Sequence, residues 1–148
     1  MNTIIKPFDK LTTQDLFRIY KLRVDVFVVE QQCPYHEIDD IDLISHHIYL
    51  QNHSSIILAY CRLYKQNDTF HIGRVIATER RKGYGTQIMK TAIEFAEVTL
   101  HADTIIIEAQ TYAQKFYEKL GFVQISESFE EDGIPHIQMK YICLLYTS

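Results

Sequence analysis

Apolar residues recur along the chain with two different periods, which predict helices in some segments and strands in others. Spacings of three and four residues predict helices over about residues 13–31 and 83–99, and a shorter one over 113–120. Alternating or continuous apolar runs predict strands between them. These strands cover residues 3–7, 47–50, 55–64, 70–77, 103–109, 122–129 and 136–144.

The order of these elements predicts the fold class. Along the chain they follow one another as β-α-β-β-β-α-β-α-β-β, which indicates an α/β (α+β) protein with a mixed, mostly antiparallel central sheet. We expect about six to seven strands flanked by helices. No linker, repeat or low-complexity segment interrupts the pattern, so one domain is expected over residues 1–148. A polar loop is predicted up to about Ser45, and an acidic turn at residues 130–133.

Composition and net charge narrow the class of protein. Of the 148 residues, 47% are hydrophobic and 23% are charged, as in ordinary globular proteins. A net charge of −4 argues against a protein that coats nucleic acid. Three separated cysteines without a C-x-x-C pair indicate free thiols in a reducing compartment. No apolar run approaches the roughly 18–20 residues that cross a bilayer. We therefore expect a cytoplasmic protein that binds neither nucleic acid nor membrane.

A basic loop with two glycines stands between a predicted strand and a predicted helix, within residues 72–86. Backbone N–H groups at a helix N-terminus lack internal partners, so such a place favours an anion. Gly83 and Gly85 let a phosphate approach the backbone, and the run Arg80-Arg81-Lys82 adds positive charge. The pattern R-x-x-G-x-G is neither a Walker A loop nor a Rossmann loop. An exposed basic turn and a nucleic-acid contact are the alternative interpretations.

Two motifs together carry a family resemblance. R-x-x-G-x-G follows a strand, and A-x-x-F-Y-x-x-L-G-F stands at residues 113–122. With these motifs and its element order, the chain resembles the GNAT superfamily of acyl-CoA-dependent N-acyltransferases from about Leu16 to Met139. Residues 22–35, 109–110 and 131–136 further resemble the ElaA-type branch of that superfamily.

The resemblance implies that acetyl-CoA is the acyl donor. Its pyrophosphate would be held by the R-x-x-G-x-G loop through backbone N–H groups, and its pantetheine arm would pair with the preceding strand. A backbone N–H of that strand would polarise the thioester carbonyl. Gln110 stands where many GNAT proteins have an asparagine that contacts pantetheine. The implied cofactor contacts are Arg74, Val75, Ile76, Arg80, Arg81, Lys82, Gly83, Tyr84, Gly85, Thr86, Gln110 and Tyr117.

The resemblance also implies residues that take part in group transfer. Tyr117 matches the tyrosine that often protonates the leaving thiolate, and a core or sulfur-contacting tyrosine is the alternative. A lysine-type amine has a pKa of about 10.4, so a base must take its proton before it attacks. Glu30 and His136 lie in the branch signatures and are the predicted catalytic bases, with purely structural roles as the alternative. Glu37 and Glu108 are predicted to contact the substrate.

The function expected is transfer of the acetyl group of acetyl-CoA to a primary amine on a small molecule or peptide. A non-catalytic acyl-CoA-binding module is the alternative. Uneven charge favours the enzyme: residues 74–90 carry five Lys or Arg against Glu79 alone, whereas residues 30–42 carry five Asp or Glu and no Lys or Arg. A basic end suits a coenzyme's phosphates, and an acidic side suits a cationic amine.

Two further expectations concern metal binding and oligomeric state. No metal is expected, because His46 and His47 are adjacent on a strand and point to opposite faces. The acidic residues after Glu37 also lack EF-hand spacing. The apolar segment 142–146 suggests an interface in a homodimer.

Overall fold

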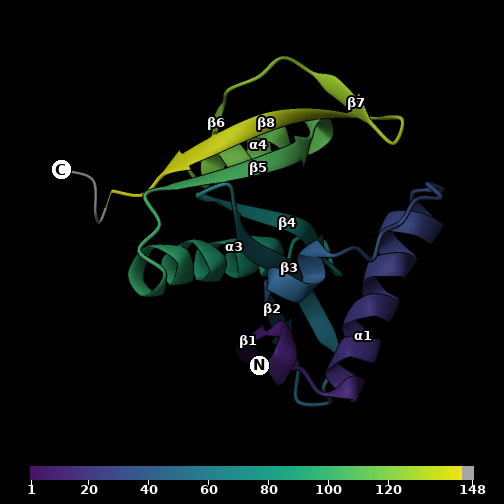
Figure 1. Cartoon of the computed structure of the whole chain (residues 1–148). Coiled ribbons are helices and arrows are strands. Elements are labelled where there is room, and N and C mark those ends of the chain that lie inside the picture. Colours follow the sequence, from purple (N-terminus) through teal and green to yellow (C-terminus); the bar gives the residue numbers. More distant parts are fainter. Residues whose placement is uncertain (145–148) are drawn as a thin grey trace.

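Eight strands form one mixed sheet in the computed structural model, which describes residues 1–144 (Figure 1). Their order is β1-β2-β3-β4-β5-β8-β6, and β7 also pairs with β8. Every pair is antiparallel except β4 with β5, so the mixed, mostly antiparallel sheet expected from the sequence is confirmed. The strands are β1 (Asn2–Pro7), β2 (His46–Gln51), β3 (Ile57–Gln66), β4 (Thr69–Ala77), β5 (Thr104–Gln110), β6 (Val123–Gln124), β7 (Phe129–Glu131) and β8 (Ile134–Ile142).

The helices lie close to where the periodicity predicts them. Thr12 caps the first helix, because its hydroxyl accepts the Asp15 N–H while the Asp15 carboxylate accepts the Thr12 N–H. Two helices continue as π-helical segments. The helical elements are η1 (Phe8–Lys10), α1 (Thr13–Val24) with η2 (Asp25–Glu30), α2 (Ile41–Ile44), α3 (Tyr84–Glu94) with η3 (Phe95–Thr99), η4 (Thr111–Ala113) and α4 (Gln114–Lys119). Within residues 1–144, none of them is long and apolar enough to cross a bilayer.

Alternating side chains place helices on both faces of the sheet. On β2, Ile48 and Leu50 join the larger apolar core with α3 and α4. Tyr49 between them points the other way, into a smaller core with Ile19 of α1. Figure 1 accordingly shows α1 and α3 on different sides of β2 and β3.

Three predictions about local structure were wrong. The predicted strand 122–129 is two short strands, because the Ser126 hydroxyl accepts the Gln138 N–H that a continuous ladder would use. This break explains why the sheet has eight strands rather than six or seven. Glu130 and Glu131, predicted in a turn, belong to β7, and the polar loop before Ser45 contains α2. Of the apolar segment 142–146, residues 145 and 146 lie outside the described range.

A buried group of charges lies between α1 and the sheet. The Arg23 side chain is fully buried, and its Nε is 2.9 Å from Glu37 Oε2. Its two terminal nitrogens donate to both carboxylate oxygens of Asp42, at 2.6 and 3.0 Å. Arg62 of β3 donates to Asp42 at 3.0 Å and to Asp39 at 2.6 Å. These contacts fix the segment 37–42, which the sequence predicts to be part of a polar loop, against the sheet.

The arginines keep the carboxylates of this group ionised. Burial alone would raise the pKa of Asp42, but hydrogen bonds and positive charge from Arg23 and Arg62 outweigh burial and lower it. The pKa of Asp39 is lowered against burial in the same way, by Arg62 and Arg74. The group therefore behaves as a set of mutually compensated charges.

Replacing Arg23 should test how strongly the fold depends on this group. Arg23→Ala leaves Glu37 and Asp42 buried without their main partner, which costs about 3–5 kcal/mol in the free energy of unfolding. Lys21→Ala, at an exposed site on the same helix, should change it by less than about 0.5 kcal/mol. Urea unfolding at neutral pH measures both. Equal, small effects of the two variants would contradict a structural role for the buried charges.

Candidate active site

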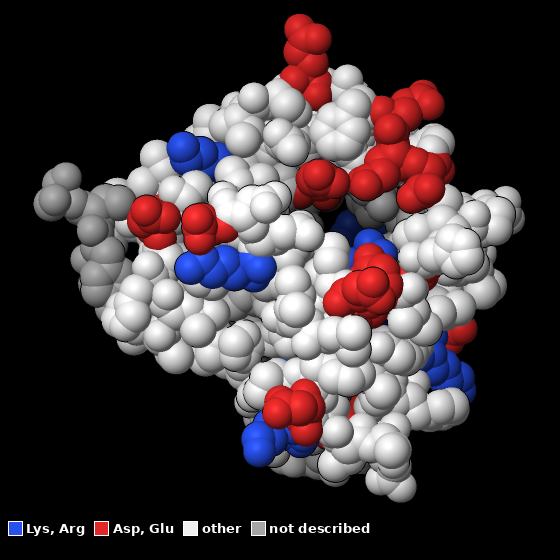
Figure 2. Space-filling model, viewed as in Figure 1, with Lys and Arg blue, Asp and Glu red and all other residues white. Residues whose placement is uncertain are grey.

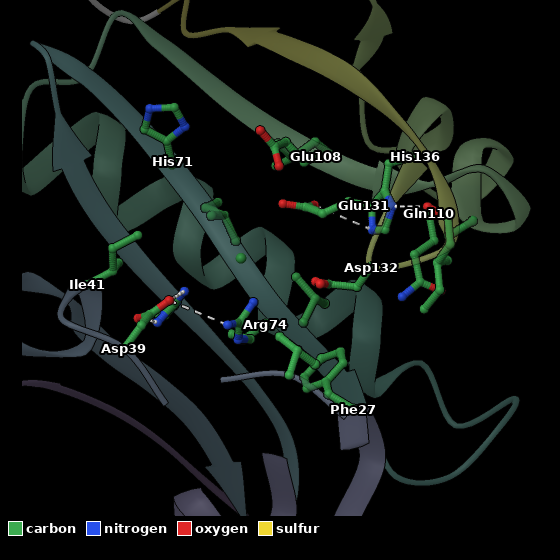
Figure 3. A pocket seen from close by; sticks show the side chains of 18 of the residues that line it. Phe27, Asp39, Ile41, His71, Arg74, Glu108, Gln110, Glu131, Asp132 and His136 are labelled. Atoms are coloured by element: carbon green, nitrogen blue, oxygen red, sulfur yellow. Dashed lines mark hydrogen bonds and ion pairs between the residues drawn. The ribbon is translucent and has the colours of Figure 1, made fainter. Parts of the chain in front are cut away.

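A cavity of about 490 Å³ opens where β4 and β5 part (Figure 3). The two strands pair only at Phe70 with Ile105 and at His71 with Ile106. Beyond this point they diverge, as the ribbons in Figure 1 show. The cavity is lined by Gly73, Arg74 and Val75 of β4 and by Ile106, Glu108 and Gln110 of β5. Such a gap between parallel strands is a natural binding site, because unpaired strand edges and side chains from both strands face it.

A β-bulge interrupts β4 at the edge of this cavity. Tyr60 pairs with Ile76 and Arg62 with Gly73, so the two residues Arg74 and Val75 lie opposite one residue of β3. Arg74 has a φ of +52°, a left-handed conformation that residues with a Cβ rarely adopt. The bulge removes a residue from the regular ladder with β3, so backbone groups of β4 can turn toward the cavity.

The R-x-x-G-x-G loop leads directly from β4 into α3. Gly83 is the N-cap of α3 with a φ of +75°, and the first turn of this helix carries no acidic residue. The side chains of Arg80, Arg81 and Lys82 are exposed. Free N–H groups, a helix dipole and three cations therefore meet at this end of α3, which is the chemistry that holds a phosphate.

Carboxylates and a histidine form the opposite wall of the cavity. Glu108 and Gln110 of β5 point into it, as do Glu131, Asp132 and His136 of the β7–β8 hairpin (Figure 3). In Figure 2, acidic side chains surround the opening of a hollow, and a basic side chain lies deeper inside. This wall can attract a cationic group. Among the described residues, no group of three or more His, Cys, Asp or Glu is arranged to hold a metal ion.

The acidic wall is suited to accepting a proton. Partial burial and the negative charge of the neighbouring Glu108 carboxylate raise the pKa of Glu131. His136 Nδ1 donates to the Ile134 carbonyl at 2.7 Å, which leaves Nε2 as the proton-accepting nitrogen of the neutral ring. That Nε2 lies 3.9 Å from Glu131 Oε2. Two proton-accepting groups therefore lie near each other on this wall, beyond direct hydrogen-bond distance.

Tyr117 reaches the cavity from α4. Its ring is buried, in edge-on contact with Phe116 and Phe122. Burial raises the pKa of its phenol well above the usual value, so the hydroxyl stays protonated at neutral pH. Gly85 allows α3 to approach α4 here, since a Cβ at this position would lie 3.3 Å from the Phe116 ring. A proton donor thus lies inside the site.

Family comparison identifies this arrangement. Residues 15–143 match the model of the acetyltransferase (GNAT) domain. The chain belongs to the GNAT acetyltransferase family. It is 38% identical over 137 residues to the protein ElaA of Escherichia coli, covering 88% of this chain and 89% of ElaA. It is also 41% identical over 141 residues to a UPF0039 protein of Schizosaccharomyces pombe, covering 93% and 94% of the two chains.

Solved structures agree with the GNAT fold. An acyl-CoA N-acyltransferase from Pseudomonas aeruginosa superimposes with a TM-score of 0.89 at 36% identity, over 95% of this chain and 99% of that one. The crystal structure of Escherichia coli ElaA gives the same TM-score and coverage at 34% identity. An aminoglycoside 6'-N-acetyltransferase complexed with coenzyme A has a TM-score of 0.74 at 11% identity, covering 98% and 99%, and shares the fold alone. The resemblance to GNAT proteins and to ElaA is thus confirmed.

The fold brings several of the predicted GNAT residues into one cavity. Arg74, Val75, Gln110 and Tyr117 line it, and so does His136. Gln110 is held by Gln31, since its Nε2 donates to the Gln31 side-chain oxygen at 3.4 Å. Ile76 follows in β4 but its side chain is buried in the core beside α1. Only its backbone is therefore placed for the pairing that the resemblance implies.

Two predicted carboxylates do not fit the roles first given to them. Glu37 is 3% exposed and is paired with Arg23 and Arg74, so it offers no free charge to a substrate. Glu30 lies at the exposed end of the helical segment after α1 and does not line the cavity. Burial and ion pairing decide against Glu37, and distance from the cavity decides against Glu30; both depend on the tertiary fold.

Glu131 and Asp132 are site residues that sequence reasoning missed. Both lie in the stretch 131–136 that resembles the ElaA-type branch, but their acidic neighbours and Gly133 predict only a turn there. The pairing of Glu131 with Ile134 in a tight hairpin brings them over the cavity. The combination of acidic residues, Gly133 and a histidine three residues beyond it was the available signal.

Neutralising Glu108 should weaken Glu131 as a base. Glu108→Gln removes a negative charge that raises the pKa of Glu131, so that pKa should fall toward its ordinary value. A carbon-detected NMR titration of the Glu131 carboxyl group measures the shift. Glu127→Gln, an exposed control in the same hairpin region, should leave it unchanged. An unaltered Glu131 titration in Glu108→Gln would refute the coupling.

Proposed function

We propose that this GNAT protein is an acetyl-CoA-dependent N-acetyltransferase that acts on a primary amine by direct attack on the thioester. The observation that carries the proposal is one cavity with a bulged strand on one wall, carboxylates and an imidazole on the other, and a protonated phenol between them. These are the three groups that acyl transfer to an amine needs: a carbonyl-polarising donor, a base and an acid.

The residues present fit acetyl-CoA as the acyl donor. The R-x-x-G-x-G loop would supply backbone donors and cations for the pyrophosphate, and the Arg74–Ile76 backbone and Gln110 would hold the pantetheine arm. The coenzyme A complex of the aminoglycoside acetyltransferase, which shares the fold, supports this assignment. The thioester of acetyl-CoA would supply an activated acyl group. Groups of the protein would supply the base, the acid and the carbonyl-polarising donor.

The acidic wall would bind the amine and remove its proton. The carboxylates of Glu108 and Asp132 attract the ammonium form from solution. Glu131, a stronger base than an ordinary carboxylate because its pKa is raised, takes the proton together with His136 Nε2. The neutral amine can then attack. This assigns the base to His136, as first predicted, and adds Glu131 in place of Glu30.

The remaining two steps concern the thioester carbonyl and sulfur. As the amine nitrogen bonds to the carbonyl carbon, a backbone N–H of the β4 bulge stabilises the developing oxygen charge, by about 3 kcal/mol per donor. As the carbon–sulfur bond breaks, the sulfur leaves with its electron pair. Tyr117 gives its proton to that thiolate, and water or the protonated base restores the phenol.

The acceptor would be a small molecule or a peptide that carries a cationic primary amine. The acidic wall supports this class, and it disfavours polyanionic partners such as nucleic acid. We place the protein in the cytoplasm, because its three cysteines are buried and form no disulfide. A homodimer through the apolar segment 142–146 remains part of the proposal.

Release of free coenzyme A tests the proposed activity. Wild-type protein should release it from acetyl-CoA with at least one amine from a panel of diamines, amino-acid amides and lysine peptides. Tyr117→Phe should lower kcat by about a hundredfold without changing the affinity for acetyl-CoA. Tyr141→Phe, which removes a phenol outside the cavity, should retain wild-type kcat. Acetyl-CoA binding without turnover of any amine would instead indicate a non-catalytic binding module.

The phosphate-binding role of the loop can be tested by two matched glycine substitutions. Gly83→Ala and Gly133→Ala each force a Cβ into a positive φ, of +75° and +77°, with open space around it. Both should lose about 1 kcal/mol of stability. Only Gly83→Ala should also weaken coenzyme A binding, measured by calorimetry. Equal coenzyme A affinity in the two variants would argue against the loop as the phosphate site.

A further inference from the structure

The bulge in β4 contains a residue whose type disfavours the backbone conformation that it adopts there. Arg74 carries a Cβ and a long side chain, yet its φ of +52° lies in the left-handed region where glycine is preferred. Such a conformation persists only when surrounding contacts impose it. The contacts of the Arg74 side chain therefore reveal what shapes this wall of the cavity.

The Arg74 guanidinium is held by one segment of the chain, residues 27–39. Its Nε lies 2.7 Å from Glu37 Oε2, and its Nη2 donates to the Glu37 carbonyl at 2.8 Å. A weaker contact at 3.5 Å joins it to Asp39 Oδ2. The rings of Tyr35 and Phe27 lie 5.4 and 6.0 Å from the guanidinium carbon. Figure 3 shows Arg74 pointing toward Asp39, away from the acidic wall.

Glu37 is itself fixed from the far side by α1. Arg23 donates to its carboxylate at 2.9 Å and to its carbonyl at 3.1 Å, and both side chains are almost completely buried. A continuous chain of ion pairs therefore runs from α1 through Glu37 to the left-handed residue of β4.

The same segment also reaches both parts of the opposite wall, β5 and the β7–β8 hairpin. The Cys33 thiol donates to the Asp132 carbonyl at 3.4 Å, and the Gln31 side chain accepts a hydrogen bond from Gln110. Residues 31–39 thus contact the bulge of β4, the end of β5 and the acidic hairpin. One segment sets the relative position of all three.

We propose that Arg23, Glu37 and Arg74 are positioning residues that form an ionic clamp on the β4 bulge. The clamp holds Arg74 in its left-handed conformation, so that the N–H groups of Val75 and Ile76 keep the orientation in which they meet the acyl donor. This inference rests on the proposed function for its catalytic consequence. In this clamp, the Arg74 side chain fixes the backbone conformation of β4 and does not contact the substrate.

A glycine substitution at position 74 distinguishes a positioning role of the Arg74 side chain from a direct contact with a reactant. Arg74→Ala keeps the unfavourable φ and removes the clamp, whereas Arg74→Gly removes the clamp and the cost of the conformation together. The clamp predicts that kcat of Arg74→Gly exceeds that of Arg74→Ala by about tenfold, with a smaller difference in KM for the amine. If the guanidinium binds a reactant, both variants should lose activity equally, and that result would overturn the proposal.

Hydrogen exchange gives a readout that does not depend on turnover. Amides of residues 72–77 should exchange faster in Arg74→Ala and in Glu37→Gln than in the wild type, while those of β8 stay protected. Glu130→Gln, an exposed control, should match the wild type. If Arg74→Gly folds and Arg74→Ala does not, that result also supports the clamp. Unchanged exchange at residues 72–77 in Glu37→Gln would overturn it.

The two proposals fail in different ways. If no amine releases coenzyme A with wild-type protein, the proposed function fails. The clamp is then still supported if exchange at residues 72–77 rises and acetyl-CoA binds Arg74→Gly more tightly than Arg74→Ala. If turnover is present but the two Arg74 variants agree in kcat, exchange and affinity, the clamp alone is overturned.

Discussion

The compensation of buried charge between α1 and the sheet is the constraint on which the rest of this structure depends. Arg23, Arg62 and Arg74 face Glu37, Asp39 and Asp42, and four of these six groups have side chains no more than 4% exposed. Removing charges from water is costly, so each carboxylate must meet its arginine, and the segment 37–42 has few places to lie. That segment in turn borders the cavity, and the bulged strand β4 is stable next to the segment.

The fold could be predicted from the sequence far better than the site. Elements follow from local periodicity, and the cap at Thr12 and the glycine at position 83 mark helix starts within a few residues. Whether Glu37 is free or paired depends on Arg23 and Arg74, which lie far from it in the chain and nearby only after folding. The bulge at Arg74 could not be foreseen either, because arginine carries no propensity for a positive φ.

The two walls of the cavity use different parts of the polypeptide. The wall formed by β4 offers backbone groups, while its arginine is already neutralised by carboxylates. The wall formed by β5 and the β7–β8 hairpin offers side chains, and Glu108, Glu131 and Asp132 have no arginine or lysine among the cavity residues of their own elements. The cavity is therefore polarised although the chain as a whole is only mildly acidic, with a net charge of −4.

The narrow seam between β4 and β5 also bears on how the molecule assembles. Strands β1 to β4 pair among themselves within the first half of the chain, and β5 to β8 pair within the second half. Only two residue pairs, Phe70 with Ile105 and His71 with Ile106, join the halves along the sheet. Phe70 and Ile105 are closer in sequence than Pro7 and His46, which pair within the first half, so loop length does not set this seam apart. What does set it apart is its narrowness: the cavity lies where only these two residue pairs hold the two half-sheets together along the sheet.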